Sequence, residues 1–106
     1  MKFVKGTFMR AMANRNNVEQ EARIYEGVFA VYKMPCADSE NWCLDHAPTG
    51  LTITRACRRK DCIAKIEALL PLLDWNADSP EVLTKRADCN GNFRSAYLAA
   101  INTVAS

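Results

Sequence analysis

Hydrophobic and polar positions change their spacing about halfway along the chain. In the first half, β-branched and aromatic residues crowd together in residues 24–33, which predicts a central strand. Residues 42–46 and 51–56 alternate between apolar and polar positions, the period of a half-buried strand. Between them, Pro48 fixes φ at one corner of a turn and Gly50 allows a positive φ at the other. These segments predict a three-stranded antiparallel β-meander.

The second half follows a helical period. Apolar residues in the segment 60–70 recur at spacings of three and four and fall on one stripe of a helix. Ser79 and Pro80 are typical of a helix cap and a first helical position, so they predict a second helix over 80–88. A third apolar face predicts a helix over 92–104. Strands followed by helices are typical of the α+β class, and we expect the three helices to cover one face of the sheet.

The first 22 residues fit neither period. Lys5 and Arg10 interrupt their apolar positions, and the asparagine-rich segment 14–17 is typical of a turn. We therefore expect residues 1–22 to form an N-terminal arm or a short helix. The chain of 106 residues has the length of a single domain, residues 1–106.

Composition and charge exclude several classes of protein. Half of the residues are apolar (49%) and a quarter are charged (25%), which indicates a folded chain. The net charge of +2 is too small to indicate a nucleic-acid partner by itself. No apolar run approaches the roughly 20 residues of a membrane span, and charges break the N-terminal apolar stretch, so neither a membrane protein nor an exported one is expected. In the cytoplasm that this implies, the five cysteines are expected to be thiols.

Catalytic and metal-binding patterns are weak. Cys43 and His46 would serve as nucleophile and base, but residues three apart on a strand point to opposite faces. We instead interpret His46 as the end of a strand, packed beside Trp42 and hydrogen-bonded to the turn. A zinc site would draw on Cys36, Cys43, His46 and Cys57, but no paired Cys-x-x-Cys knuckle is present. We expect no enzyme, no metal and no cofactor, and the open enzymatic alternative is a site assembled from scattered residues such as Asp45, His46, Cys57 and Arg59.

A cluster of cations immediately before the first helix is the best functional signal: Arg55, Arg58, Arg59 and Lys60. A helix N-terminus favours acidic residues, and here only Asp61 offsets the cations. Cations beside exposed helix N–H groups predict a binding surface for anions, either the carboxylates of an acidic protein or nucleic-acid phosphates. A solvated surface is the alternative. Secondary binding candidates are His46 and Thr49 of the turn and Arg94 of the last helix.

The last two predicted helices also have the outline of a helix-turn-helix. A recognition helix presents several polar or basic side chains near its start. The helix over 92–104 offers Asn92, Arg94 and Ser95 and then becomes rich in alanine. A DNA- or RNA-binding regulator that uses residues 80–104 or the basic cluster therefore remains an alternative function.

The segments FAVYK and WCLDHAPTGLTI, followed by an amphipathic helix with a basic start, resemble small strand–turn–strand–helix proteins encoded by phages and other mobile elements. The resemblance covers residues 28–70, and the HAPTG turn is its most distinctive part. It carries no catalytic residues. It implies a compact accessory protein that works by binding a host or phage component, as inhibitors of bacterial defence systems such as anti-CRISPR proteins do.

These observations together predict a small, non-enzymatic intracellular protein that acts by stoichiometric protein–protein binding. Its expected partner is acidic or itself handles nucleic acid. An inhibitor of a host defence complex such as CRISPR is the narrower expectation that the resemblance adds.

Overall fold

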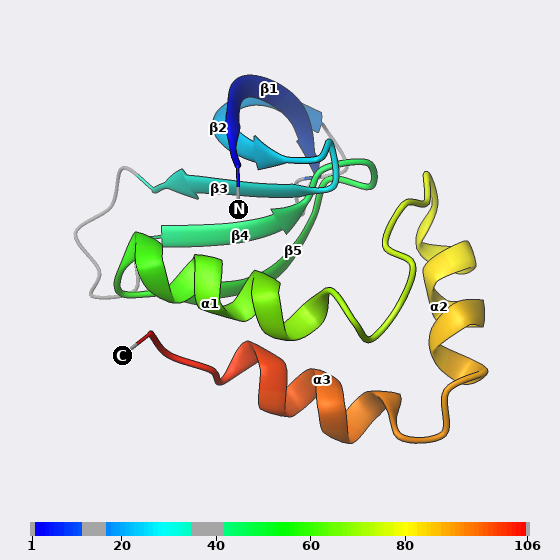
Figure 1. Ribbon diagram of the computed structural model, residues 1–106. Helices are drawn as coiled ribbons and strands as arrows, with labels where there is room; N and C mark the ends of the chain where they lie inside the picture. The colour runs from blue at the N-terminus through cyan, green and yellow to red at the C-terminus, as the bar shows by residue number, and fades with distance from the viewer. Residues whose placement is uncertain (1, 12–16, 35–41, 106) are drawn as a thin grey trace.

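The computed structural model describes residues 2–11, 17–34 and 42–105 (Figure 1). The α+β class predicted from the sequence is confirmed. The part of the chain described contains five strands: β1 (Val4–Ala11), β2 (Asn17–Tyr25), β3 (Phe29–Lys33), β4 (Trp42–His46) and β5 (Leu51–Ala56). It also contains three helices: α1 (Arg59–Leu69), α2 (Pro80–Asp88) and α3 (Phe93–Ile101). Within these ranges no helix has the length and apolar character that crossing a membrane requires.

The sheet is an antiparallel meander with the order β1-β2-β3-β4-β5. The prediction of three strands was therefore wrong in number, although β4 and β5 have the predicted bounds. The single strand expected over 24–33 is divided between the end of β2 and β3. Glu26 and Gly27 both have positive φ, 51° and 71°, which is the signature of a tight hairpin turn. A turn of this kind reverses the chain where one continuous strand was expected.

The expected N-terminal arm is a β-hairpin. β1 pairs with β2 over its whole length, from Val4 opposite Ile24 to Ala11 opposite Asn17. The prediction of an arm or short helix over 1–22 was therefore wrong for the described residues. The predicted turn at 14–17 and the loop that contains Cys36 lie largely outside them.

The sheet separates two groups of buried side chains. The face toward α1 holds the larger core: Phe29, Val31, Leu44, Ala56, Cys62, Ile66, Leu69, Trp75 and Ala100. The opposite face, called the inner face below, buries Phe8, Ala22, Ala30, Tyr32 and Cys43. β1 and β2 curve away from the plane of the other strands (Figure 1). The backbone N–H of Ala11 donates to the carbonyl of Gly50 at 2.9 Å, so the end of β1 meets the β4–β5 turn.

α1 and α3 form layers on one side of the sheet. α1 lies against β3, β4 and β5, α3 packs along α1, and α2 contacts α3 (Figure 1). Between α1 and α2, Trp75 enters the core, where its ring lies 5.6 Å from that of Phe29 and 6.3 Å from that of Phe93. Its indole N–H donates to the carbonyl of Leu69 at 2.8 Å, which satisfies the buried polar group. The prediction that three helices cover one face is thus met by α1 with α3 behind it, whereas α2 stands beside them and contacts α3 (Figure 1).

Candidate binding site

The HAPTG turn is held by interactions within the fold. His46 is buried, and its Nε2 donates to the carbonyl of Trp75 at 2.6 Å. Because that carbonyl can only accept, Nδ1 carries no proton in the neutral ring and accepts from the hydroxyl of Thr49 at 2.9 Å. Burial lowers the pKa of His46, and the bond to Trp75 opposes that shift. His46 thus hydrogen-bonds the turn as expected, and its aromatic neighbour is Trp75, at 6.4 Å between ring centroids.

The residues proposed for the catalytic alternatives do not lie together in one site. Cys43 is buried on the inner face, while His46 faces Trp75 on the side of α1, so the strand separates them. Cys57 and Arg59 are exposed. In residues 2–11, 17–34 and 42–105, no three ligand-type side chains gather in the way a metal ion requires. Cys43, Cys57, Cys62 and Cys89 form no disulfide there, and Cys36 lies outside the described residues.

The start of α1 does not hold the predicted cations together. Arg58 is the residue before the helix, and its Nε and Nη2 donate to the two carboxylate oxygens of Asp61 at 2.9 and 2.8 Å. This bidentate bond lowers the pKa of Asp61, as does the backbone N–H of Ala105, which donates to Oδ1 at 2.9 Å. The charge of Arg58 is therefore already matched, and its carboxylate partner also holds the C-terminal segment.

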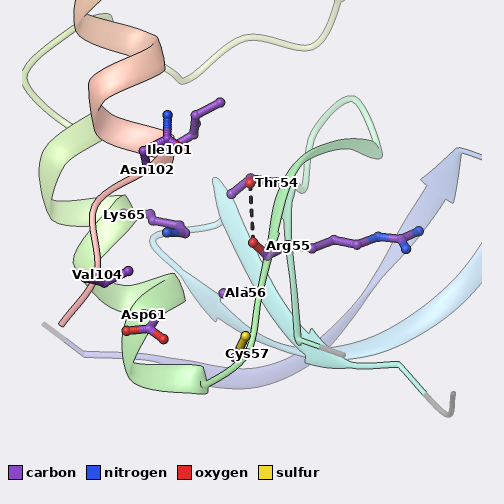
Figure 2. Close-up of a pocket in the computed structure, with 9 residues that line it drawn as sticks. All are labelled: Thr54, Arg55, Ala56, Cys57, Asp61, Lys65, Ile101, Asn102 and Val104. Carbon is purple, nitrogen blue, oxygen red and sulfur yellow. Dashed lines mark hydrogen bonds between the residues drawn. The ribbon is translucent and has the colours of Figure 1, made fainter. Parts of the chain in front are cut away.

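A cleft of about 280 Å³ lies beside this ion pair, between β5, the start of α1 and the segment after α3 (Figure 2). The two charged side chains that α1 contributes to it are already engaged. Lys65, which is buried, donates to the backbone carbonyl of Thr103, and Asp61 bonds Arg58 and Ala105. The cleft therefore serves to dock the C-terminal segment on α1.

Arg59 extends the basic cluster onto the sheet. Its guanidinium lies 5.9 Å from the ring centroid of Phe3, which in turn lies 5.7 Å from the ring of Tyr25. Two residues after Phe3, Lys5 stands directly opposite Arg23 across the β1–β2 pair. Arg23 is also opposite Val31 of the larger core, so these side chains share the face toward α1. We call Phe3, Lys5, Arg23 and Arg59 the cationic surface.

The other predicted site residues are separated. Lys60 is exposed and borders a shallow groove with the C-terminal segment, and Arg94 is exposed on α3. Arg55 points away from α1, across the sheet, in Figure 2. It stands opposite Cys43 and lines a cavity on the inner face. The four-residue cluster predicted from the sequence thus divides between two faces of the sheet.

The inner face holds a polar network that the sequence did not reveal. Tyr32 donates through its hydroxyl to Oδ2 of Asp45 at 2.9 Å, and Nη1 of Arg10 donates to the Tyr32 oxygen at 3.3 Å. Asp45 is fully buried, and its Oδ1 has no hydrogen-bond partner among the described residues. Burial raises the pKa of Asp45; Tyr32, the nearby Thr52 hydroxyl and the charges of Arg10 and Arg55 oppose that rise.

Strand pairing explains why sequence reasoning missed Lys5, Arg23 and Arg10. Each of them is an isolated cation in the sequence, and only the register of the β1–β2 hairpin brings Lys5 and Arg23 together. The alternating pattern of a strand was the one available signal. Comparison with known proteins adds no further guide, because no protein family, curated protein or solved structure matches the chain.

Proposed function

We propose that this protein acts by stoichiometric, non-enzymatic binding to an acidic protein, and that the cationic surface makes the contact. The observation that carries the proposal is the facing pair of Lys5 and Arg23 beside Arg59. Like charges directly opposite each other destabilise a sheet. Among the described residues, neither Lys5, Arg23 nor Arg59 has an ion-pair partner. An acidic partner would relieve this repulsion.

Aromatic rings next to the cations support an interface. Phe3 and Tyr25 are only partly buried and pack against the edge of the larger core. Aromatic and arginine side chains are enriched in protein interfaces and often supply most of the binding energy. Phe3 also holds Arg59 through a cation–π contact, which limits the conformational entropy that the guanidinium would lose on binding.

The distribution of charge along β1 and β2 favours a protein partner over a nucleic-acid partner. Moving away from Lys5 and Arg23 on the same face, the next opposed pairs are Thr7 with Glu21 and Met9 with Glu19. The face therefore changes from basic to acidic within about 7–14 Å along the strands. A nucleic-acid backbone is uniformly negative and would meet the two glutamates. A protein surface with the complementary pattern of charges avoids that repulsion.

The test reverses charge on the cationic surface without disturbing the fold. In Arg23→Glu, the new carboxylate faces Lys5 and makes a favourable cross-strand pair. In Arg59→Glu, an acidic residue enters the first turn of α1, where the helix dipole favours it. Arg58 is left unchanged because of its bond to Asp61. The double variant should stay folded and lose its partner.

The measurement is affinity purification of the tagged protein from its native cells, with the retained proteins quantified and the enriched one then titrated by calorimetry. The matched control is Lys85→Glu with Arg94→Glu, an equal charge change on the exposed surfaces of α2 and α3. The control variant should retain a partner protein at a ratio of one to one. The variant Arg23→Glu/Arg59→Glu should lose that protein. If both variants retain the partner protein equally, the cationic surface is not part of the interface. If only the control variant loses the partner protein, the interface lies on α2 and α3.

The nucleic-acid alternative is tested in parallel by gel-shift titration with a short DNA duplex and a single-stranded RNA. Binding with a steep salt dependence, abolished by either double variant, would replace the protein partner with nucleic acid. The narrower proposal, inhibition of a bacterial defence complex, rests on the resemblance in residues 28–70. It requires that the partner found by purification belong to such a complex.

A further inference from the structure

A cavity of about 190 Å³ opens on the inner face, on the opposite side of the sheet from the cationic surface. Arg10 and Arg55 line it, together with Tyr32, Cys43 and Thr52. Drug-sized ligands occupy pockets of about 300–1,000 Å³, so this cavity suits a small group. What the cavity binds is independent of the function proposed above.

Arg10 is held at the wall of the cavity by fixed neighbours. Its Nη1 lies 3.3 Å from both the Tyr32 hydroxyl and Oε1 of Gln20, and its guanidinium lies 5.6 Å from the Tyr32 ring centroid. Tyr32 gives its own proton to Asp45, so the lone pairs of its oxygen are left to accept from Arg10. Asp45 thereby orients Tyr32, and Tyr32 positions Arg10.

Arg55 supplies a second cation from β5. It stands opposite Cys43 of β4, on the same face of the sheet as Tyr32. No carboxylate of the described residues forms an ion pair with Arg10 or with Arg55. Burial raises the pKa of the Cys43 thiol, which keeps this lining group neutral. Two cations without an ion-pair partner among the described residues therefore face one small cavity, and the nearest carboxylate, Asp45, lies behind Tyr32 and interacts with both at longer range.

Three of the residues that line the cavity carry hydrogen-bond donors, and they come from two different strands. Arg10 comes from β1, Arg55 and the Thr52 hydroxyl come from β5, and guanidinium groups bind oxyanions through paired N–H bonds. A planar carboxylate presents two oxygens in one plane and is satisfied by one guanidinium. A tetrahedral oxyanion presents oxygens in all directions and makes use of both arginines and the hydroxyl.

We propose that this cavity binds a tetrahedral oxyanion of the phosphate class, either free phosphate or the phosphate group of a small monoester, between Arg10 and Arg55. The anion neutralises both guanidiniums, and the Thr52 hydroxyl donates to it. Tyr32 is a positioning residue, since it acts by fixing Arg10. Asp45 acts indirectly, because it accepts the hydrogen bond that orients Tyr32.

The experiment measures binding of inorganic phosphate and of ribose 5-phosphate by calorimetry and thermal unfolding, with sodium chloride and sodium acetate at equal ionic strength as controls. At least one phosphate compound should bind one to one and raise the melting temperature more than either control salt. Stabilisation by both phosphate compounds points to the phosphate group alone. Stabilisation only by ribose 5-phosphate points to a monoester, and only by inorganic phosphate to the free ion.

Variants connect the binding to the cavity. Because Arg55 is exposed, Arg55→Gln should fold normally, and it should bind phosphate at least about ten-fold more weakly than the parent. Arg55→Lys should have an intermediate affinity, because lysine keeps the charge but lacks the paired donors. Tyr32→Phe should weaken binding while Arg94→Gln leaves it unchanged. The proposal is overturned if no phosphate compound stabilises the protein beyond the control salts, or if Arg55→Gln binds with the affinity of the parent.

Discussion

The contact between β1 and the β4–β5 turn can be tested by adding one methyl group. Gly50 has a φ of 74°, and a Cβ at this position would lie 2.2 Å from the carbonyl oxygen of Met9 and 2.9 Å from the nitrogen of Ala11. Both atoms belong to backbone, so neither can rotate away. Gly50→Ala must therefore separate the end of β1 from the turn and break the hydrogen bond between Ala11 and Gly50.

Gly27→Ala is a matched control for the strain of a positive φ. Gly27 has a φ of 71°, and nothing lies within 4 Å of a Cβ added there. A left-handed conformation costs an alanine about 1–2 kcal/mol, and the stiffer unfolded chain returns about 0.4–1 kcal/mol. Gly27→Ala should thus lose about 1 kcal/mol of the free energy of unfolding. In a domain of this size, that lowers the melting temperature by about 4–8 °C.

Gly50→Ala carries the same strain and adds the collision. One broken hydrogen bond contributes about 1 kcal/mol, and forcing the strands apart brings the total to about 4 kcal/mol, the range of the most damaging substitutions. Urea unfolding followed by circular dichroism measures both variants. If Gly50→Ala fails to fold at 25 °C, the same comparison is made in the presence of a stabilising osmolyte such as trimethylamine N-oxide, added equally to both variants. Equal losses at the two glycines would refute the close approach of β1 to the turn.

Two buried titratable groups give further predictions. Because burial raises the pKa of Asp45 above 3.8, the folded state binds more protons than the unfolded state just above that pH, so stability falls as pH rises through this window. Asp45→Asn should remove that slope, and exposed Asp78→Asn is the control in urea titrations. His46 has the opposite sign: its pKa is lowered from 6.5, so its contribution is complete above that pH and declines as the pH falls below it. His46→Gln should abolish this decline and cost about 1–3 kcal/mol for two hydrogen bonds, and an unchanged pH profile would contradict the buried neutral ring.

The elements that the sequence predicted well carry their own local signals. β4 and β5 alternate over Trp42–His46 and 51–54, with one side of each strand toward the larger core, and a bulge in their pairing at Leu44 and Asp45 interrupts the pattern after that. α2 begins at Pro80 as expected, where Ser79 accepts from the backbone N–H of Val82. α1 and α3 follow from apolar stripes, although α3 ends at Ile101 because the following residues dock on α1. The local sequence pattern was sufficient to predict an element wherever the tertiary packing of that element followed the pattern.

The β1–β2 hairpin was missed because its pattern is partly reversed. Arg10 and Gln20 occupy inward positions beside the cavity, where a strand normally carries apolar residues. Val4, on the same side as Arg10, is 65% exposed, and Met9, on the other side, is 51% exposed. Polar residues inside and apolar residues outside cancel the period of two. A sequence that breaks its local pattern in this way does so where function or an interface imposes another demand.

The HAPTG turn, the most distinctive part of the resemblance, is explained by structure alone. His46 ties the turn to Trp75, Thr49 bonds His46, and Gly50 allows β1 to close against the sheet. In this chain the motif therefore serves to close a curved sheet. Specificity must come from residues that the closed sheet displays. We propose that these are Arg23 and Arg59 on one side and Arg10 and Arg55 on the other, which have no ion-pair partner among the described residues.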